Sequence, residues 1–180
     1  MQWKTLKSEK ILQNNFFTIK KDRCEKTDGK IVEEYYTIER SDVAVIAALT
    51  PENELILIKQ YRYPVDAVDF ELPAGYLELN GENIMDAAKR ELLEETGYSS
   101  NNFEKIGECF ASAGTMNNTV HFFLAKNCEK VAEQNLDDNE ELTVEIVTWE
   151  KSLEMLKNGM IKDLGSVNGL LLAKENISNS

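Results

Sequence analysis

The most constraining feature of the sequence is one amphipathic stretch, residues 83–96, that is followed directly by a glycine. Apolar residues recur at every fourth position along it, which produces a single stripe that can face a core. Gly97 suits the left-handed conformation that commonly follows the last turn of a helix. The pattern therefore predicts a helix over residues 83–96 whose buried stripe is Ile84, Ala88 and Leu92.

A second face of this helix is acidic. Glu91, Glu94 and Glu95 lie at positions i, i+3 and i+4, so their carboxylates share one side of the helix. Such a cluster is either a solvated acidic surface or a site for a divalent cation. Hard cations such as Mg²⁺ take oxygen ligands and commonly lie between carboxylates and substrate phosphates. Spacing alone leaves both interpretations open.

The residues around the helix resemble the signature of the Nudix hydrolases. That signature is a Gly, five residues, a Glu, seven residues, and then Arg-Glu-apolar-any-Glu-Glu-any-Gly-apolar. Residues 90–98, RELLEETGY, match its second part, and Glu82 lies at the required spacing before Arg90. Six residues instead of five separate Gly75 from Glu82, so the loop carries one extra residue.

This resemblance implies a metal-dependent hydrolase of nucleoside diphosphates that are linked to another moiety. The implied cation is Mg²⁺, with Mn²⁺ as an alternative, and the implied ligands are Glu91, Glu94, Glu95 and the backbone carbonyl of Ala74. Arg90 is expected to point away from the metal face and to pair with Glu82, which would support the ligands from behind. On spacing alone, an ion pair of Arg90 with Asp86 is an equal alternative.

Apolar runs around the helix predict a main domain with a mixed sheet. Residues 43–49, VAVIAAL, are continuously apolar, which is typical of a strand buried on both faces. Strands before and after a central helix predict an α/β fold in which helices cover both faces of the sheet. The resemblance implies the same Nudix-type α/β/α sandwich over about residues 41–175. Further strands are expected at residues 55–61, 68–72, 103–111, 120–125 and 143–149, and loops at 60–64 and 129–142.

Two helices are expected near the end of the chain, at residues 150–158 and from Asp163 to about residue 174. Asp163 could cap the second of them. Residues 176–180 are expected to fray. The apolar side of the last helix should consist of Leu164, Val167, Leu170 and Leu171.

Residues 1–40 form a separate N-terminal β region in this scheme, ahead of a Nudix hydrolase domain at residues 41–180. Strands at 16–19 and 31–38 flank Asp28-Gly29, a strong signal for an antiparallel hairpin. Two strands alone are marginal in water. We therefore expect this region to pack on the main domain or on a second subunit.

Three flanking segments resemble the ADP-ribose and nucleoside-diphosphate-sugar pyrophosphatases. They are WKTL at residues 3–6, QYR at 60–62 and ELPAG at 71–75. The resemblance implies a homodimer that exchanges N-terminal strands and holds the base between aromatic side chains. Phe17 and Trp3 are the candidates for base stacking, with hydrophobic packing as an equal alternative. Arg62 is the candidate for a substrate contact, and a plain surface arginine is its alternative.

Two loops bear on substrate choice and catalysis. ADP-ribose-specific members commonly carry a proline where this chain has Ala113, which leaves other nucleotide sugars open as substrates. The general base of this subfamily is usually a glutamate on a loop after the sheet, and the acidic run at residues 137–141 lies there. Alignment of the following strand with the family selects Glu140 as the base, with Glu141 and Asp138 as alternatives. The run could also be an acidic loop that is simply solvated and has no catalytic role. His121, the only histidine, is expected to pack or orient and not to catalyse.

Charge and composition limit the remaining function classes. The formal net charge of -12 argues against a nucleic-acid-binding surface and means that substrate phosphates must be met by locally placed cations. Three cysteines without a CxxC pair suit a reducing compartment. No apolar run reaches the length of a signal peptide or a membrane span, so we expect a soluble cytoplasmic protein.

These observations predict a pyrophosphohydrolase that splits a nucleoside diphosphate sugar, ADP-ribose or a related compound, into a nucleoside monophosphate and a sugar phosphate. One alternative is a Nudix hydrolase of nucleoside triphosphates or other diphosphate conjugates. Another is a sensor that binds a nucleotide sugar without cleaving it. Because the chain keeps every carboxylate of the signature, the sequence favours an enzyme over a sensor.

Overall fold

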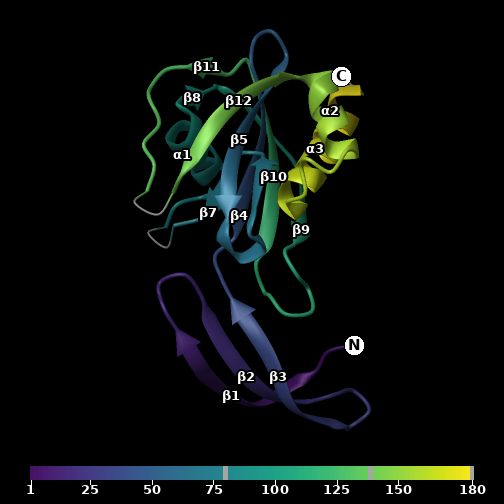
Figure 1. Cartoon of the computed structure of the whole chain (residues 1–180). Coiled ribbons are helices and arrows are strands. Elements are labelled where there is room, and N and C mark those ends of the chain that lie inside the picture. Colours follow the sequence, from purple (N-terminus) through teal and green to yellow (C-terminus); the bar gives the residue numbers. More distant parts are fainter. Residues whose placement is uncertain (79–80, 138–139, 179–180) are drawn as a thin grey trace. The chain divides into compact units, whose positions relative to one another are not determined.

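The chain divides into two compact units in the computed structural model, which describes residues 1–78, 81–137 and 140–178 (Figure 1). The first unit comprises Met1–Asp42 together with Cys109–Thr119. The second comprises Val43–Glu108 and Val120–Ser180. The loop at 109–119 thus belongs with the N-terminal strands, although the sequence suggests nothing of this kind.

A three-stranded antiparallel sheet forms the first unit, in the order β1 (Lys4–Gln13), β2 (Thr18–Glu25) and β3 (Ile31–Glu39). The hairpin between β2 and β3 is confirmed: the Gly29 N–H donates to the carbonyl of Lys26 at 2.9 Å, and Gly29 has a φ of 81°. The expectation of only two strands is wrong, because β1 pairs with β2 along its whole length. Every residue of β1 is exposed, so its sequence lacks the alternation of apolar and polar residues that marks a half-buried strand.

The 109–119 loop is tied to β3 by hydrogen bonds within the first unit. The Ile38 N–H donates to the carbonyl of Thr115 at 2.7 Å, and the Tyr35 hydroxyl donates to the carbonyl of Gly114 at 2.9 Å. The predicted strand at 16–19 begins only at Thr18, since the N–H groups of Phe16 and Phe17 both donate to the Asn14 side chain in a turn.

A mixed seven-stranded sheet is the centre of the second unit, as predicted. Strands β4 and β10 run parallel, whereas the ladders of β4 with β5 and of β5 with β12 are antiparallel. Two short strands attach to this path, β6 to β5 and β7 to β4. The order along the sheet is β12 (Leu142–Thr148), β5 (Glu54–Arg62), β4 (Val43–Leu49), β10 (Thr119–Lys126) and β9 (Asn102–Phe110), with β6 at Ala67–Glu71 and β7 at Ala74–Tyr76.

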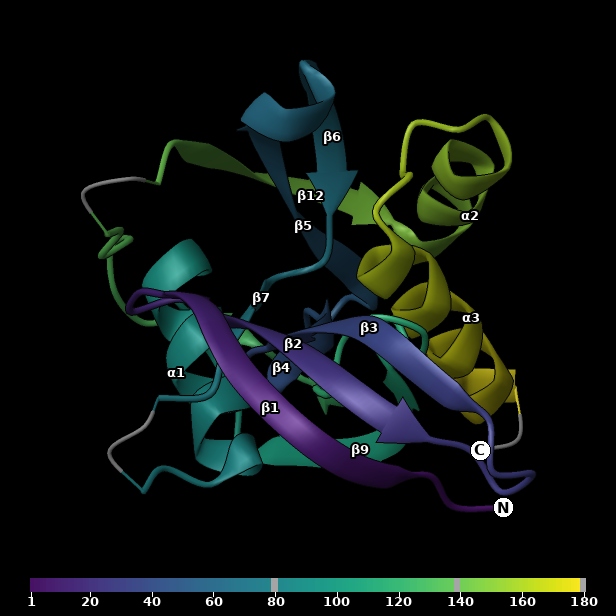
Figure 2. The same ribbon diagram turned by 90° about the horizontal axis from the view of Figure 1, so that it is seen from below.

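Helices cover both faces of this sheet, which confirms the α/β/α sandwich (Figures 1 and 2). Helix α1 (Ile84–Thr96) lies on one face, and α2 (Trp149–Lys157) and α3 (Leu164–Ser178) lie on the other. Alternate residues of β4 point to opposite faces, so both of its sides are buried. Ala44, Ile46 and Ala48 pack with Ala88 and Leu92 of α1, while Val45, Ala47 and Leu49 pack with Met155, Leu170 and Ala173 of α2 and α3.

The predicted apolar side of the last helix is partly wrong. Leu164 and Leu171 are 64% and 48% exposed, and α3 instead buries Ser166, Gly169, Leu170 and Ala173. Small residues let the helix approach the sheet closely: a Cβ on Gly169 would lie 2.6 Å from a methyl group of Leu72. The helix continues to Ser178, so it is longer than expected, while residues 179–180 of the stretch expected to fray lie outside the described residues. Asp163 caps it as predicted, accepting from the Ser166 N–H at 2.8 Å.

Both predicted loops contain regular structure. Strand β5 runs through Arg62 and is followed by a short 3₁₀ helix, η1 (Tyr63–Val65), so the expected loop at 60–64 is wrong in its first half. Two-residue strands β8 (Tyr98–Ser99) and β11 (Glu129–Lys130) pair with each other in regions that carry too few residues for a periodic signal. Within the described part of the chain, no helix combines the length and apolarity that a membrane span requires.

Candidate active site

Helix α1 carries the acidic face and is held at both ends. The Asn83 side chain accepts from the N–H groups of Met85 and Asp86, and Gly97, with a φ of 75°, donates to the Leu93 carbonyl. The apolar stripe turns the helix so that its acidic side meets strand β7. Glu91 and Glu95 are only 9% and 4% exposed, which is unusual for carboxylates and requires polar or charged partners.

Strand β7 brings one predicted metal ligand against another. The Ala74 N–H donates to Oε2 of Glu95 at 2.9 Å, while β7 itself is fixed by pairing with β4, where Ala74 lies opposite Val45. The predicted ligands Ala74 and Glu95 are therefore neighbours. This contact joins the residue before the first glycine of the signature to a carboxylate near its end, across 21 residues.

Gly75 explains why the signature opens with a glycine. A Cβ at this position would lie 2.0 Å from Cδ of Glu91 and 2.1 and 2.3 Å from its two carboxylate oxygens. The requirement is one of space, because Gly75 is not among the residues with positive φ. The Glu91 carboxylate thus lies directly against the backbone of β7.

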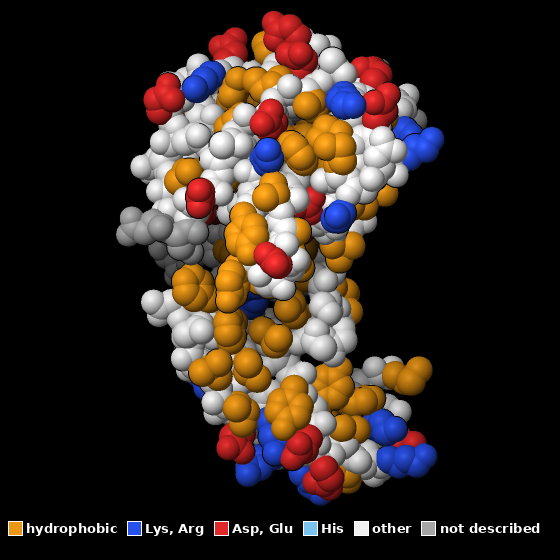
Figure 3. All heavy atoms as spheres, in the orientation of Figure 1, with side chains coloured by type: hydrophobic (Ala, Val, Ile, Leu, Met, Phe, Trp, Pro, Cys, Tyr) orange, Lys and Arg blue, Asp and Glu red, His pale blue; other side chains and the backbone are white. Residues whose placement is uncertain are grey.

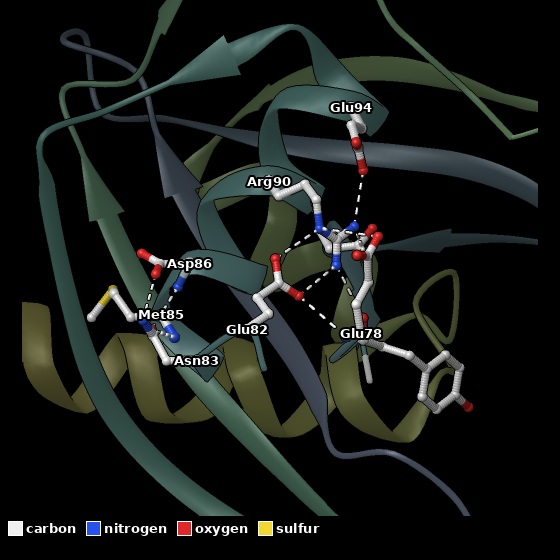
Figure 4. A network of polar contacts seen from close by, with 9 residues as sticks. Glu78, Glu82, Asn83, Met85, Asp86, Arg90 and Glu94 are labelled. Atoms are coloured by element: carbon white, nitrogen blue, oxygen red, sulfur yellow. Dashed lines mark hydrogen bonds and ion pairs between the residues drawn. The ribbon is translucent and has the colours of Figure 1, made fainter. Parts of the chain in front are cut away.

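Arg90 occupies the centre of the acidic face (Figure 4). Its Nε and Nη2 donate to the two carboxylate oxygens of Glu82 at 2.9 and 3.1 Å, so the predicted pair is present. Nη1 donates to Glu91 at 2.8 Å and to Glu94 at 2.9 Å. The expectation that Arg90 points away from the metal face is therefore wrong. Asp86, its alternative partner, accepts from Asn83 at the start of the helix.

The extra residue in the loop leaves this pairing intact. Leu79 and Asn80 lie outside the described residues, but Glu78 and Gly81 on either side are described, and Gly81 has a φ of 93°. The Glu78 N–H donates to Oε2 of Glu82 at 3.2 Å. Glu82 therefore reaches Arg90 despite the longer loop, and the hydrogen bond from Arg90 lowers the pKa of the Glu82 carboxyl.

Negative charge on the acidic face is unfavourable and only partly compensated by Arg90. Burial raises the pKa of Glu91 to about 7, and the charges of Glu94 and Glu140 add to the effect although Arg90 opposes it. Burial also raises the pKa of Glu95 well above its usual range, again with contributions from Glu91 and Glu140. Oxygen-only donors with unneutralised charge suit a hard divalent cation. Among the described residues no three acidic, His or Cys side chains already converge on one point, since Arg90 Nη1 lies between Glu91 and Glu94.

A segment that the sequence analysis missed, residues 131–135, binds the end of α1. The N–H groups of Val131 and Ala132 donate to the Gly97 carbonyl at 2.9 and 3.1 Å, and the Asn135 N–H donates to the Glu94 carbonyl at 2.9 Å. The Gln134 side chain donates to the Glu95 carbonyl at 2.6 Å. These bonds satisfy carbonyls that a helix end leaves without partners. They connect the acidic loop to the residues that carry the carboxylates.

The loop continues to the predicted general base. Oε2 of Glu140 accepts from the Asp137 N–H at 3.0 Å, and the charge of Glu140 is among the smaller causes that raise the pKa of Glu91 and Glu95. Glu141 is exposed and comes directly before β12. Asp138, the other alternative, lies outside the described residues.

Arg62 ends strand β5 and forms a two-pronged ion pair with Glu71 of β6. Nε donates to Oε1 at 2.7 Å and Nη2 donates to Oε2 at 2.5 Å. Glu71 is 2% exposed, and the sequence analysis did not single it out. Sequence position alone gives no signal for the pair, because the ladder of β5 and β6 places Glu71 opposite Ile58 and Arg62 opposite Ala67.

The remaining predicted residues belong to other elements of the chain. Trp3, Phe17 and Ala113 belong to the first unit. Trp3 is 44% exposed and packs edge-on against Tyr35, with ring centroids 6.0 Å apart. Ala113 lies in an exposed turn. His121 belongs to β10, and its Nδ1 lies 3.3 Å from a carboxylate oxygen of Glu108. Roles of the three first-unit residues in substrate binding stay predictions.

Comparison with known proteins adds independent information. The NUDIX domain model matches residues 40–164, and the model for the nucleoside diphosphate sugar hydrolase N-terminal domain matches residues 3–38. ADP-ribose pyrophosphatase of Bacillus subtilis (strain 168) is 33% identical over 164 residues, which cover 91% of this chain and 88% of that protein. GDP-mannose pyrophosphatase of Salmonella typhimurium (strain LT2) is 27% identical over 171 residues, with 88% of each protein covered.

A solved structure shares the fold. The crystal structure of an ADP compounds hydrolase superposes with a TM-score of 0.87 and covers 99% of this chain and 96% of its own. Its sequence identity is 19%, so this likeness bears on the fold alone.

Proposed function

Since the chain belongs to the Nudix family, as a pyrophosphohydrolase of the nucleoside-diphosphate-sugar type, we propose that it hydrolyses ADP-ribose or a closely related nucleotide sugar. The products would be a nucleoside monophosphate and a sugar phosphate. The observation that carries the proposal is the succession of two family matches, residues 3–38 and 40–164, across one chain. The 33% identical ADP-ribose pyrophosphatase favours ADP-ribose, and the GDP-mannose pyrophosphatase makes GDP-mannose the second candidate.

We propose Mg²⁺, with Mn²⁺ as the alternative, as the cofactor. When bound, the cation would neutralise phosphate charge and lower the pKa of the attacking water. Arg90 would keep Glu82 as its partner through Nε and Nη2, so Glu91 and Glu94 could turn to a cation without leaving the guanidinium unpaired. The ligands would be Glu91, Glu94, Glu95 and the carbonyl of Ala74.

Glu140 is the proposed general base. It would accept a proton from the water as the water oxygen attacks one phosphorus, and the bridging oxygen would leave with the other phosphate. The influence of Glu140 on the pKa values of Glu91 and Glu95 supports this choice. Glu141 is the alternative base, and Glu94 would act in catalysis as a metal ligand.

The first unit supports a homodimer. Figure 3 shows hydrophobic side chains on the surface, and those of the first unit that are large and exposed include Trp3, Leu6, Ile11, Leu12, Phe16, Ile31 and Tyr36. An apolar surface of this kind usually marks an interface. We propose that a second copy covers it and that Phe17 and Trp3 stack on the base of the substrate, with Arg62 and the loop at Ala113 as further contacts. Light scattering coupled to gel filtration measures the oligomeric state, and a monomer at micromolar concentration would contradict the dimer.

A substrate panel tests the activity. The purified full-length protein is incubated with Mg²⁺ and ADP-ribose, GDP-mannose, other nucleotide sugars or nucleoside triphosphates, and products are separated by chromatography. We expect AMP and ribose 5-phosphate from ADP-ribose. Preferential cleavage of triphosphates would instead favour the second enzyme class. Tight binding of a nucleotide sugar by calorimetry, with no product over hours, would favour a sensor.

Two sets of variants test the assigned roles. Glu95→Gln should lower turnover by orders of magnitude while the thermal transition stays close to that of the wild type, because a lost cation ligand removes charge stabilisation in the transition state. Undiminished hydrolysis would refute the metal assignment. Glu140→Gln should slow the reaction more than Glu141→Gln, and unchanged rates in both would refute the loop assignment.

A further inference from the structure

The ion pair of Arg62 and Glu71 is strongly asymmetric in exposure. The Glu71 side chain is 3% exposed, whereas that of Arg62 is 45% exposed. Both carboxylate oxygens are bonded, at 2.7 and 2.5 Å, by the Nε and Nη2 atoms of one guanidinium. A buried carboxylate therefore holds one edge of a cation whose side chain is nearly half exposed.

This arrangement leaves donors available on Arg62. A guanidinium has five N–H groups, and the pair with Glu71 uses two of them. Among the described residues, no other acceptor for Arg62 is present in the hydrogen-bond network. The remaining N–H groups lie in a plane fixed by the buried fork, which matches the geometry of phosphate oxygens.

Chain connectivity places this cation beside the acidic site. Glu71 precedes Ala74 by three residues, and the Ala74 N–H is bonded to Glu95. Three residues of extended chain span at most about 10 Å. The charges of Asp163 and Glu95 also contribute to the raised pKa of Arg62, after the larger effect of Glu71. The chain has a net charge of -12, so a phosphate-rich substrate needs locally placed cations, and the half-exposed guanidinium of Arg62 can serve as one of them.

We propose that Glu71 is a positioning residue, which holds Arg62 in a fixed orientation so that its outer N–H groups bind a phosphate oxygen of the substrate. The proposal rests on the proposed function, because it requires a diphosphate substrate. Glu71 is buried and does not itself touch the substrate. Holding the arginine in advance removes the entropy that a mobile side chain would lose on binding.

A purely structural ion pair would behave differently. Glu71→Gln keeps the size of the side chain but removes the charge, so the guanidinium keeps one neutral oxygen acceptor in place of two carboxylate oxygens. Arg62 can still be solvated, because its side chain is 45% exposed. If the pair served stability alone, the thermal transition would fall and the KM would not change. If Glu71 positions Arg62, the KM rises while the transition temperature changes little.

The test measures kcat, KM and thermal stability of the full-length protein in the presence of Mg²⁺. Hydrogen bonds to charged groups correspond to roughly a 10-fold to 100-fold change in an equilibrium. We expect the KM for ADP-ribose to rise by about that factor in Glu71→Gln, with a smaller change in kcat. Calorimetry with a non-hydrolysable α,β-methylene analogue should show the same loss of affinity. The exposed pair of Lys151 and Glu154 supplies a matched control, since Glu154→Gln also removes a paired carboxylate and should leave the KM unchanged.

A double-mutant cycle with Arg62→Gln completes the test. If Glu71 acts through Arg62, the double variant should bind the analogue no more weakly than Arg62→Gln alone, because the second change removes nothing further. Additive losses, or an unchanged KM in Glu71→Gln beside an active wild type, would overturn the positioning role. A wild-type protein that cleaves no nucleotide sugar would refute the proposed function as well.

Discussion

Gly75→Ala is a small change aimed at the contact between β7 and the acidic face of α1. A Cβ on residue 75 would lie 2.0 Å from Cδ of Glu91, and ordinary contact begins near 3.4 Å. The Glu91 carboxylate would therefore have to move by about 1.4 Å, or β7 would have to shift away from the helix. The first response costs less, because the carboxylate is the end of a flexible side chain.

Activity should suffer more than stability. Gly75 has no positive φ, so alanine fits its backbone conformation without strain. A catalytic group misplaced by about 1 Å can cost roughly 100-fold in rate. We therefore expect kcat/KM to fall by about 100-fold, together with weaker binding of Mg²⁺, while the thermal transition stays within a few degrees of the wild type.

The assay compares Gly75→Ala with Gly107→Ala. Gly107 also lies in a strand of the second unit, and a Cβ there would press on a methyl group of Leu172 at 3.0 Å, away from the acidic face. This control should change stability by a similar amount and leave turnover near that of the wild type. Turnover of Gly75→Ala within threefold of the wild type at saturating Mg²⁺ would refute the reasoning. An equal loss in both variants would point to a general effect of packing.

Three further predictions concern the loop, the helix start and the acidic face. Gln134→Ala should lower kcat by about 5-fold to 10-fold, because a lost hydrogen bond of about 1 kcal/mol loosens the loop that carries the base. The control is Glu133→Ala, which should change kcat little because the Glu133 side chain is 92% exposed; equal rates in the two variants would contradict the prediction. Asn83→Ala should destabilise the protein by about 1 kcal/mol, seen as a drop of about 2–4 °C on thermal denaturation, and Asn83→Asp should restore most of the loss. Because the folded protein raises the pKa of Glu91 to about 7, the favourable contribution of its protonated form is complete below its unfolded pKa and is lost as pH rises through 7. Thermal denaturation with EDTA between pH 5 and 8 measures this loss as a declining transition temperature, and Glu91→Gln should flatten the profile; identical slopes would refute the cause.

The main architectural predictions depended on local patterns and are confirmed. The continuous run at 43–49 forms β4, because a strand covered on both faces needs apolar side chains at every position. Helix α1 spans Ile84–Thr96 as expected, since its cap residues and its stripe lie within one segment. The common side of Glu91, Glu94 and Glu95 follows from helical spacing alone. The three-stranded form of the N-terminal sheet was not visible, because an exposed strand has no buried face to set a period.

What the sequence determined by itself is therefore the helix, its caps, its row of carboxylates and the buried centre of the sheet, all of which depend on residues a few positions apart. Only the tertiary structure decided which groups these carboxylates meet. The spacing of Arg90 on its helix could not show that its guanidinium turns onto Glu91 and Glu94, because that direction is set by the loop that returns Glu82. Nor could it show that Glu71 holds Arg62, or that residues 131–135 bind the end of α1, since strand pairing and docking of distant segments create those contacts. Local patterns specify elements, whereas the charge balance of the site depends on contacts across the whole domain.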